Sequence, residues 1–187
     1  WHDFNFRYNN NFDFHFAGKT DLIEINKKKF LTSDFDCCNF IPDYFKFNDK
    51  NKIWDLLFVG RPAFFKRLNK FYDVVRELYD KKIYIKVLCI VWKSKKKFIK
   101  DSYEFNDFYE VYLKRFSDKE RNFFNLISLD YNKPFDLHTL SQYYKKSRVY
   151  IHTSDIERRS RTTAYALKAG IPVVCMNSIA SIAKKNI

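Results

Sequence analysis

Glycine and proline are scarce in this chain, with three glycines and four prolines among 187 residues. No G-x-G-x-x-G follows any expected strand, which disfavours an NAD-dependent dinucleotide-binding enzyme. No apolar run reaches the roughly 18 residues of a membrane-spanning helix, and no signal peptide is visible. The four cysteines lack metal-binding spacing. We therefore expect reduced, mostly buried thiols, no metal site and a cytoplasmic protein.

Hydrophobic residues make up 46% of the chain and charged residues 30%, a composition typical of a globular protein. The formal net charge of +13 suits nucleic acid, an anionic membrane surface or a phosphorylated small molecule. No RNP strand or helix-turn-helix pattern is visible, so we expect no specific nucleic-acid partner, although a polyanion-binding α/β domain stays an alternative. The lysine-rich run 93–100 favours a solvated face, and it also allows peripheral contact with the inner membrane face.

Expected strands and helices alternate through residues 54–187. We expect strands at 54–60, 83–92, 124–129, 149–151 and 171–175, and helices at 64–81, 103–117, 136–146, 162–169 and from about 178. This alternation predicts an α/β fold, a Rossmann-like doubly wound parallel sheet.

The residues before 54 lack this alternation. We expect short strands at 21–25 and 37–41, with a short helix or turn at 26–33, and we place residues 46–53 as a polar linker. Residues 1–19 show no clear core pattern. The chain starts abruptly at Trp1 and stops after a helix-like stretch, so we expect it to be a piece of a longer protein.

The segment 149–176 carries the strongest pattern, VYIHTSDIERRSRTTAYALKAGIPVVCM. It predicts a strand, a charged loop, a helix ended by Gly170 and a second strand, which together form a βαβ unit. Ligands of such sheets bind beyond the carboxyl ends of strands, against helix N-termini. Here that place holds Glu157 and a run of basic and hydroxyl residues, namely Arg158, Arg159, Ser160 and Arg161.

Arginines at a helix N-terminus repel the helix dipole and one another. A bound anion would relieve both repulsions, because backbone N–H groups and guanidinium groups suit phosphate. The alternative is an ordinary solvated basic loop.

A second phosphate candidate follows the expected strand 54–60. Gly60 permits a tight turn there, Arg61 leaves that turn, and Lys66 lies in the expected first helical turn. The alternative is ordinary surface charge. Together with the 157–161 loop the pair is stronger, because both loops follow strand carboxyl ends, where a diphosphate would bind.

Four stretches in this order resemble a known family: FVGR followed by Lys66, LSQYYKKSRVYIHTS, S-x-x-E at 154–157, and A-x-x-A-G-x-P-V-V at 166–174. They resemble the carboxyl-terminal domain of GT-B glycosyltransferases of group 1, or family 4. TDLIEINKKKF and CNFIPDYF resemble the end of that family's amino-terminal domain. The resemblance implies a partial amino-terminal, acceptor-side domain at 1–45 and a truncated nucleotide-sugar-binding domain at 54–187.

The family's activity would be retaining, metal-independent transfer of a sugar from a nucleotide-diphosphate-sugar to a glycan or lipid-linked acceptor. By the resemblance, Arg61 and Lys66 would neutralise the donor diphosphate and stabilise the leaving group, and Glu157 would lie near the donor sugar. Donor contacts would come from Gly60, Arg158, Arg159, Ser160, Arg161, Thr162 and Tyr165.

Two departures from the family pattern bear on activity. Tyr165 stands where the second glutamate of the E-x7-E motif would hold the ribose hydroxyls, and the glycine-rich turn is replaced by Arg158–Arg161. A degenerate, non-catalytic transferase-like domain is therefore an alternative. Because most of the acceptor-side domain is absent, we expect this chain alone to be inactive in transfer.

Overall fold

A computed structural model of the chain describes residues 22–25, 28–31, 40–46, 51–92, 105–130, 133–154 and 160–176. The chain divides into two compact units, Trp1–Phe40 and Ile41–Ile187. The first unit contains the strands β1 (Leu22–Ile25) and β2 (Lys28–Leu31).

These two strands pair antiparallel, with Leu22 opposite Leu31 and Glu24 opposite Lys29. Residues 28–31 therefore belong to a strand, and the expected helix or turn at 26–33 is wrong for them.

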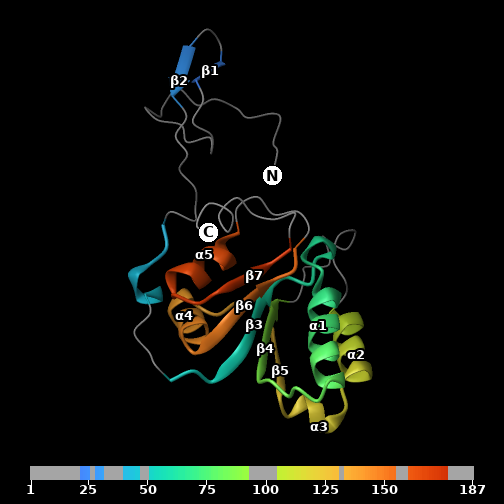
Figure 1. Cartoon of the computed structure of the whole chain (residues 1–187). Coiled ribbons are helices and arrows are strands. Elements are labelled where there is room, and N and C mark those ends of the chain that lie inside the picture. Colours follow the sequence, from blue (N-terminus) through green and yellow to red (C-terminus); the bar gives the residue numbers. More distant parts are fainter. Residues whose placement is uncertain are drawn as a thin grey trace. The chain divides into compact units, whose positions relative to one another are not determined.

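The second unit is built on a five-stranded, fully parallel sheet in the order β5-β4-β3-β6-β7 (Figure 1). Its strands are β3 (Trp54–Gly60), β4 (Val87–Trp92), β5 (Phe124–Leu129), β6 (Ser147–His152) and β7 (Val173–Cys175). Renumbered along the chain, this order is 3-2-1-4-5, and the expected Rossmann-like α/β fold is confirmed.

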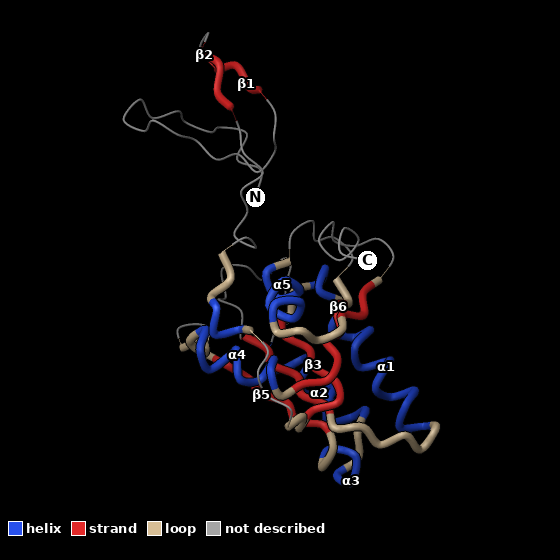
Figure 2. Tube along the Cα trace, turned by 60° about the vertical axis from the view of Figure 1, so that its left-hand side comes forward, coloured by secondary structure: helices blue, strands red, loops and turns tan. Residues whose placement is uncertain are grey.

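Helices cover both faces of the sheet (Figures 1 and 2). One layer contains α1 (Leu68–Asp80) and α2 (Phe105–Arg115), and the other contains α4 (Leu137–Lys145) and α5 (Arg161–Lys168). The short helix α3 (Asp118–Arg121) precedes β5 and begins with a capping box between Ser117 and Glu120, which sequence reasoning missed.

The two faces of the sheet bury two separate hydrophobic cores. Along β3, Leu56 and Phe58 join the core under α1 and α2, whereas Leu57 and Val59 join the core under α4 and α5. Side chains of successive strand residues point to opposite faces, so a strand covered on both sides needs a continuous apolar run. The sequence WDLLFVG meets this requirement at the centre of the sheet.

Most expected elements lie within two residues of those found, and the larger differences are at three places. The helix expected from residue 64 begins at Leu68, after a separate 3-10 turn η3 (Phe64–Lys66), because Arg67 has a positive φ of 49° that interrupts helical geometry. The strand expected from residue 83 begins at Val87, and Ile83 and Tyr84 are exposed. Phe40 and Ile41 are not part of a strand, and residues 37–39 lie outside the described residues.

Gly170 ends α5 as expected. It has a φ of 66°, and the Ile171 amide bonds the Ala166 carbonyl oxygen at 3.1 Å across the turn. This geometry is that of a Schellman C-cap, for which glycine has no steric cost.

The segment Ile41–Phe45 packs with the sheet unit, whereas the sequence grouped residues 1–45 together. It contains the 3-10 helix η2 (Asp43–Phe45), whose Phe45 is fully buried in the core under α4 and α5. The origin of residues 1–45 in an acceptor-side domain stays a prediction, and residues 47–50 of the expected linker lie outside the described residues.

Candidate functional site

The candidate site lies where β3 and β6 end, side by side at the centre of the sheet. The two strands are parallel neighbours, with Leu57 paired to Tyr150, so their carboxyl ends meet at one edge. The chain leaves β3 toward β4 on one side and leaves β6 toward β7 on the other. This reversal of strand order is the place where open α/β sheets bind ligands.

The last residue of β3, Gly60, is fixed by packing against a neighbouring ring. A Cβ atom built on Gly60 would lie 3.3 Å from the Cε1 and Cζ atoms of Phe58, closer than ordinary van der Waals contact. The Phe58 ring in turn stacks on Phe71 of α1, with ring centroids 4.9 Å apart. Glycine at this position therefore reflects the close Phe58 ring and not a positive φ.

The two cations expected after β3 lie at this edge of the sheet. Arg61 follows Gly60 directly and is exposed to solvent. Lys66 ends the η3 turn and is half-buried, with its ammonium nitrogen 5.4 Å from the centroid of the Phe65 ring. Lys66 thus lies before α1 and not in its first turn, as the sequence had suggested.

Two hydroxyl side chains fasten the η3 turn to the end of β6. Thr153 donates a hydrogen bond to the carbonyl oxygen of Lys66 at 2.7 Å, and Ser154 donates one to the carbonyl oxygen of Phe65 at 3.0 Å. Both residues are buried, with 4% and 0% of their surface exposed. The loops that follow β3 and β6 therefore touch directly, through two residues whose contacts the sequence did not predict.

The start of α5 is a compact cluster of hydroxyl groups. Ser160 is the N-cap residue, and its side chain accepts a hydrogen bond from the Thr163 amide at 3.3 Å. The Thr162 hydroxyl lies 2.9 Å from the Ser160 hydroxyl and accepts a 2.8 Å bond from the Tyr150 hydroxyl of β6. Arg161, the first helical residue, is exposed. The strand and the helix N-terminus are thereby held together.

Tyr165, expected near a ribose, has its ring in the hydrophobic core. The residue is 8% exposed, its ring stacks on Phe45 with centroids 4.4 Å apart, and it meets the edge of Tyr144 at 6.1 Å. The ring is therefore an element of packing between α5, α4 and η2. A ribose contact through its hydroxyl stays a prediction.

Three predicted site residues, Glu157, Arg158 and Arg159, lie in the segment 155–159, outside the described residues. The same holds for the lysine-rich run 93–100 and for the helix expected from residue 178. Their predicted roles stay predictions. Among the described residues, no group of three or more histidines, cysteines and acids could hold a metal ion.

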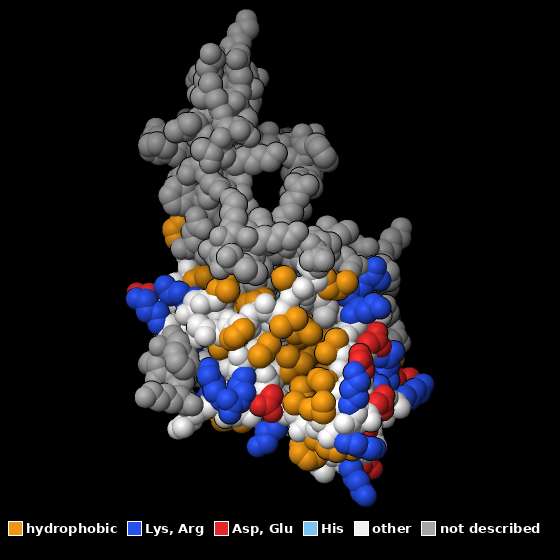
Figure 3. Space-filling model, in the orientation of Figure 1, with side chains coloured by type: hydrophobic (Ala, Val, Ile, Leu, Met, Phe, Trp, Pro, Cys, Tyr) orange, Lys and Arg blue, Asp and Glu red, His pale blue; other side chains and the backbone are white. Residues whose placement is uncertain are grey.

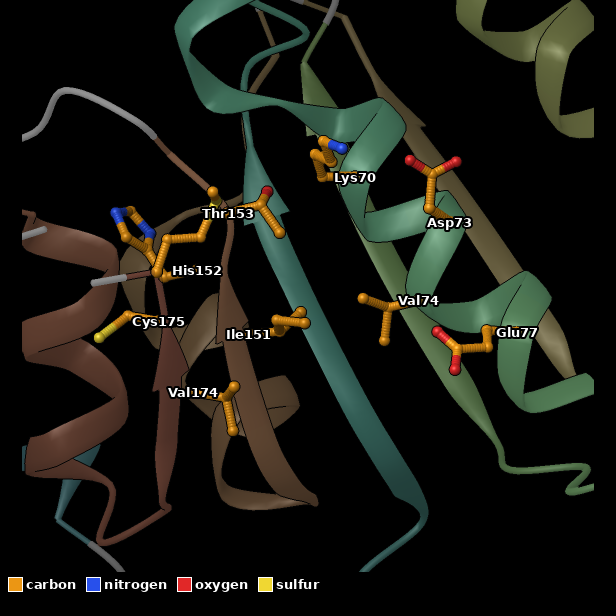
Figure 4. Close-up of a pocket in the computed structure, with 10 residues that line it drawn as sticks. Lys70, Asp73, Val74, Glu77, Ile151, His152, Thr153, Val174 and Cys175 are labelled. Carbon is orange, nitrogen blue, oxygen red and sulfur yellow. The ribbon is translucent and has the colours of Figure 1, made fainter. Parts of the chain in front are cut away.

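An apolar groove of about 310 Å³ lies beside the site, between α1 and the strands β6 and β7. In Figure 4, Thr153 and Lys70 lie at one end of the groove, and Ile151, Val74 and Val174 lie further along it. Figure 3 shows apolar side chains gathered on this face, next to charged side chains on the α1 side. Val174 is 54% exposed. The apolar side chains of this groove suit contact with apolar groups and not with a diphosphate.

Cys89 and Cys175 are free thiols within the described part of the chain. Burial raises the pKa of the Cys89 thiol well above its usual value, so this residue packs in the core and does not act as a nucleophile. No helix among the described residues is long and apolar enough to cross a membrane. No protein-family model matches the chain, and no curated protein matches it.

Proposed function

We propose that the sheet unit binds a nucleotide-diphosphate-sugar and that the protein is a retaining, metal-independent glycosyltransferase acting on a glycan or lipid-linked acceptor. The observation that carries this proposal is the direct contact between the loops after β3 and β6 at the point where the strand order reverses. One loop supplies Arg61 and Lys66, and the other leads to the N-terminus of α5.

The chemistry of this edge favours a doubly charged anion. Arg61, Lys66 and Arg161 all belong to segments that begin at this edge, and the α5 N-terminus adds the positive end of a helix dipole. The glycosyltransferase-like order of FVGR, Lys66, S-x-x-E and A-x-x-A-G-x-P-V-V agrees with this arrangement.

In the proposed reaction, the bond between the anomeric carbon and the phosphate oxygen breaks, and its electron pair leaves with the nucleoside diphosphate. The acceptor oxygen bonds to the anomeric carbon, and the proton of the acceptor hydroxyl passes to the released diphosphate. Arg61 and Lys66 would stabilise the charge that develops on the leaving phosphate, a contribution of several kcal/mol when the cations are already in place.

A degenerate, non-catalytic domain is the second candidate, and the packing of Tyr165 favours it. The position expected to hold ribose hydroxyls carries a ring stacked on Phe45 at 4.4 Å. A domain that kept the phosphate-binding edge and lost the ribose contact would bind diphosphate without productive donor binding.

The test is a titration of the purified chain with pyrophosphate, UDP, GDP and ADP, followed by thermal shift and calorimetry at physiological salt. Arg61→Ala and Lys66→Ala should each weaken diphosphate binding about tenfold, which corresponds to about 1.4 kcal/mol. Matched controls are Arg148→Ala and Lys86→Ala, which remove exposed cations at the amino ends of β6 and β4.

Equal affinity of the Arg61 and Lys66 variants and their controls would refute the phosphate assignment. Binding of all three nucleotides no tighter than pyrophosphate would favour the degenerate domain. If the chain binds single-stranded RNA instead, with an affinity that falls steeply with salt, it is a polyanion-binding domain.

A further inference from the structure

We propose that Thr153 and Ser154 are positioning residues that hold Lys66 in place for the bound anion, and we call the pair the Thr153–Ser154 clasp. This inference rests on the proposed function, because it assigns Lys66 to that anion. The two hydroxyls reach across 87 and 89 residues of chain to consecutive carbonyl oxygens, those of Lys66 and Phe65.

The Phe65 carbonyl belongs to the peptide group before the Cα atom of Lys66, and the Lys66 carbonyl belongs to the peptide group after it. Bonds to both carbonyls therefore hold the Lys66 backbone on both sides, whereas one bond alone would hold only one side. Because the donors are 4% and 0% exposed, water does not readily replace them. The clasp therefore ties the backbone of Lys66 to the residues that directly follow β6.

The backbone on either side of Lys66 does not make the η3 turn part of α1. The Lys66 amide bonds the Ala63 carbonyl oxygen at 2.9 Å, a bond internal to the turn. On the other side Arg67, with its φ of 49°, separates the turn from α1. The turn is thus not a rigid extension of the helix, and the clasp connects it to the sheet.

A lysine side chain has several rotatable bonds, so a fixed backbone reduces the conformational freedom that anion binding must remove. The ammonium group also lies against the ring of Phe65, whose own carbonyl is held by Ser154. Both the origin of the side chain and the surface on which it rests are therefore set by the clasp.

The test compares the double variant Thr153→Val/Ser154→Ala with Ser147→Ala. Ser147 is equally buried, lies at the start of the same strand, and donates a comparable 2.7 Å bond to the Tyr143 carbonyl oxygen. Without ligand, hydrogen exchange of the Lys66 amide should become at least about tenfold faster in the double variant and stay unchanged in Ser147→Ala. Pyrophosphate affinity should fall about tenfold in the double variant only.

Thr153→Ser keeps the hydroxyl but loses the methyl group. Its Lys66 amide exchange and its pyrophosphate affinity should therefore stay within about twofold of the wild-type values, whereas a loss of packing alone would change them. If the double variant does not fold, Ser154→Ala and Thr153→Val are measured singly, with the same expected direction. Unchanged Lys66 exchange, or an equal rise in Ser147→Ala, overturns the clasp. Faster exchange with unchanged pyrophosphate affinity overturns the positioning role. If the wild type binds no pyrophosphate while Lys66 exchange still rises in the double variant, the proposed function is refuted and the fastening of the turn is supported.

Discussion

Replacing Tyr165 by glutamate tests whether this position faces a ligand or the core. Under the family resemblance, glutamate restores a ribose-binding carboxylate and strengthens nucleotide binding. The structure predicts the opposite, because Tyr165 is 8% exposed and its ring stacks on Phe45 and meets Tyr144 edge to face. A carboxylate at this position would replace an aromatic ring inside a packed core.

Two effects should lower the free energy of unfolding of the Tyr165→Glu variant. Truncating a buried aromatic side chain to alanine typically costs about 3–5 kcal/mol, of which the extra methylene group of glutamate recovers part. Desolvation of the carboxyl group then adds to the cost, since burial disfavours its charged form. We expect Tyr165→Glu to lower the free energy of unfolding by about 3–5 kcal/mol, against about 1 kcal/mol or less for Tyr165→Phe.

Urea unfolding followed by circular dichroism measures both values, and its pH dependence identifies the cause. A buried glutamate has a folded-state pKa above its unfolded value, so Tyr165→Glu should be less destabilised at pH 4 than at pH 8. A Tyr165→Glu protein within about 1 kcal/mol of the wild type, with tighter UDP binding, would refute the core assignment and support the ribose role.

Two further predictions concern an ion pair between α1 and α3 and the packing of Gly60 at the end of β3. Arg76 holds Glu120 in a two-bonded ion pair at 2.6 and 2.9 Å, which lowers the pKa of Glu120 to about 2, so this stabilisation is present above pH 4.5 and lost as the pH falls toward 2. Glu120→Gln should therefore cost about 1–2 kcal/mol at pH 7 and clearly less at pH 2.5 in urea unfolding, and an equal cost at both pH values would contradict the linkage. Gly60→Ala should cost about 1–2 kcal/mol in thermal unfolding because its Cβ meets the Phe58 ring, and the same change in a Phe58→Leu background should cost less; equal costs would show that the ring is not the obstacle.

The sequence predicted the central strand β3 well, and the reason is local. β3 has the predicted bounds because a strand covered on both faces needs an unbroken apolar run, and the edge strand β5 also has its predicted bounds. The expected meeting of two loops at one edge followed from the parallel alternation of strands and helices. The predicted start of α1 was wrong because the positive φ of Arg67 interrupts the helix there, and no local residue pattern marked this interruption.

The candidate site was only partly predictable. Arg61, Lys66 and Ser160 were identified from their places after strands and before a helix. The contacts of Thr153 and Ser154 were not predicted, although both residues lie in the stretches that carry the family resemblance. Their partners are 87 and 89 residues earlier in the chain, and no spacing rule relates residues so far apart.

The sequence by itself determined the alternation of strands and helices, the parallel sheet and the edge at which basic residues gather, since each depends on periodicity and turn chemistry within short segments. Only the tertiary structure decided that Phe45 stacks on Tyr165, and that the end of β6 holds the turn carrying Lys66. Such contacts depend on how packed layers bring distant residues together, and close packing admits one partner for each side chain where the sequence allows many.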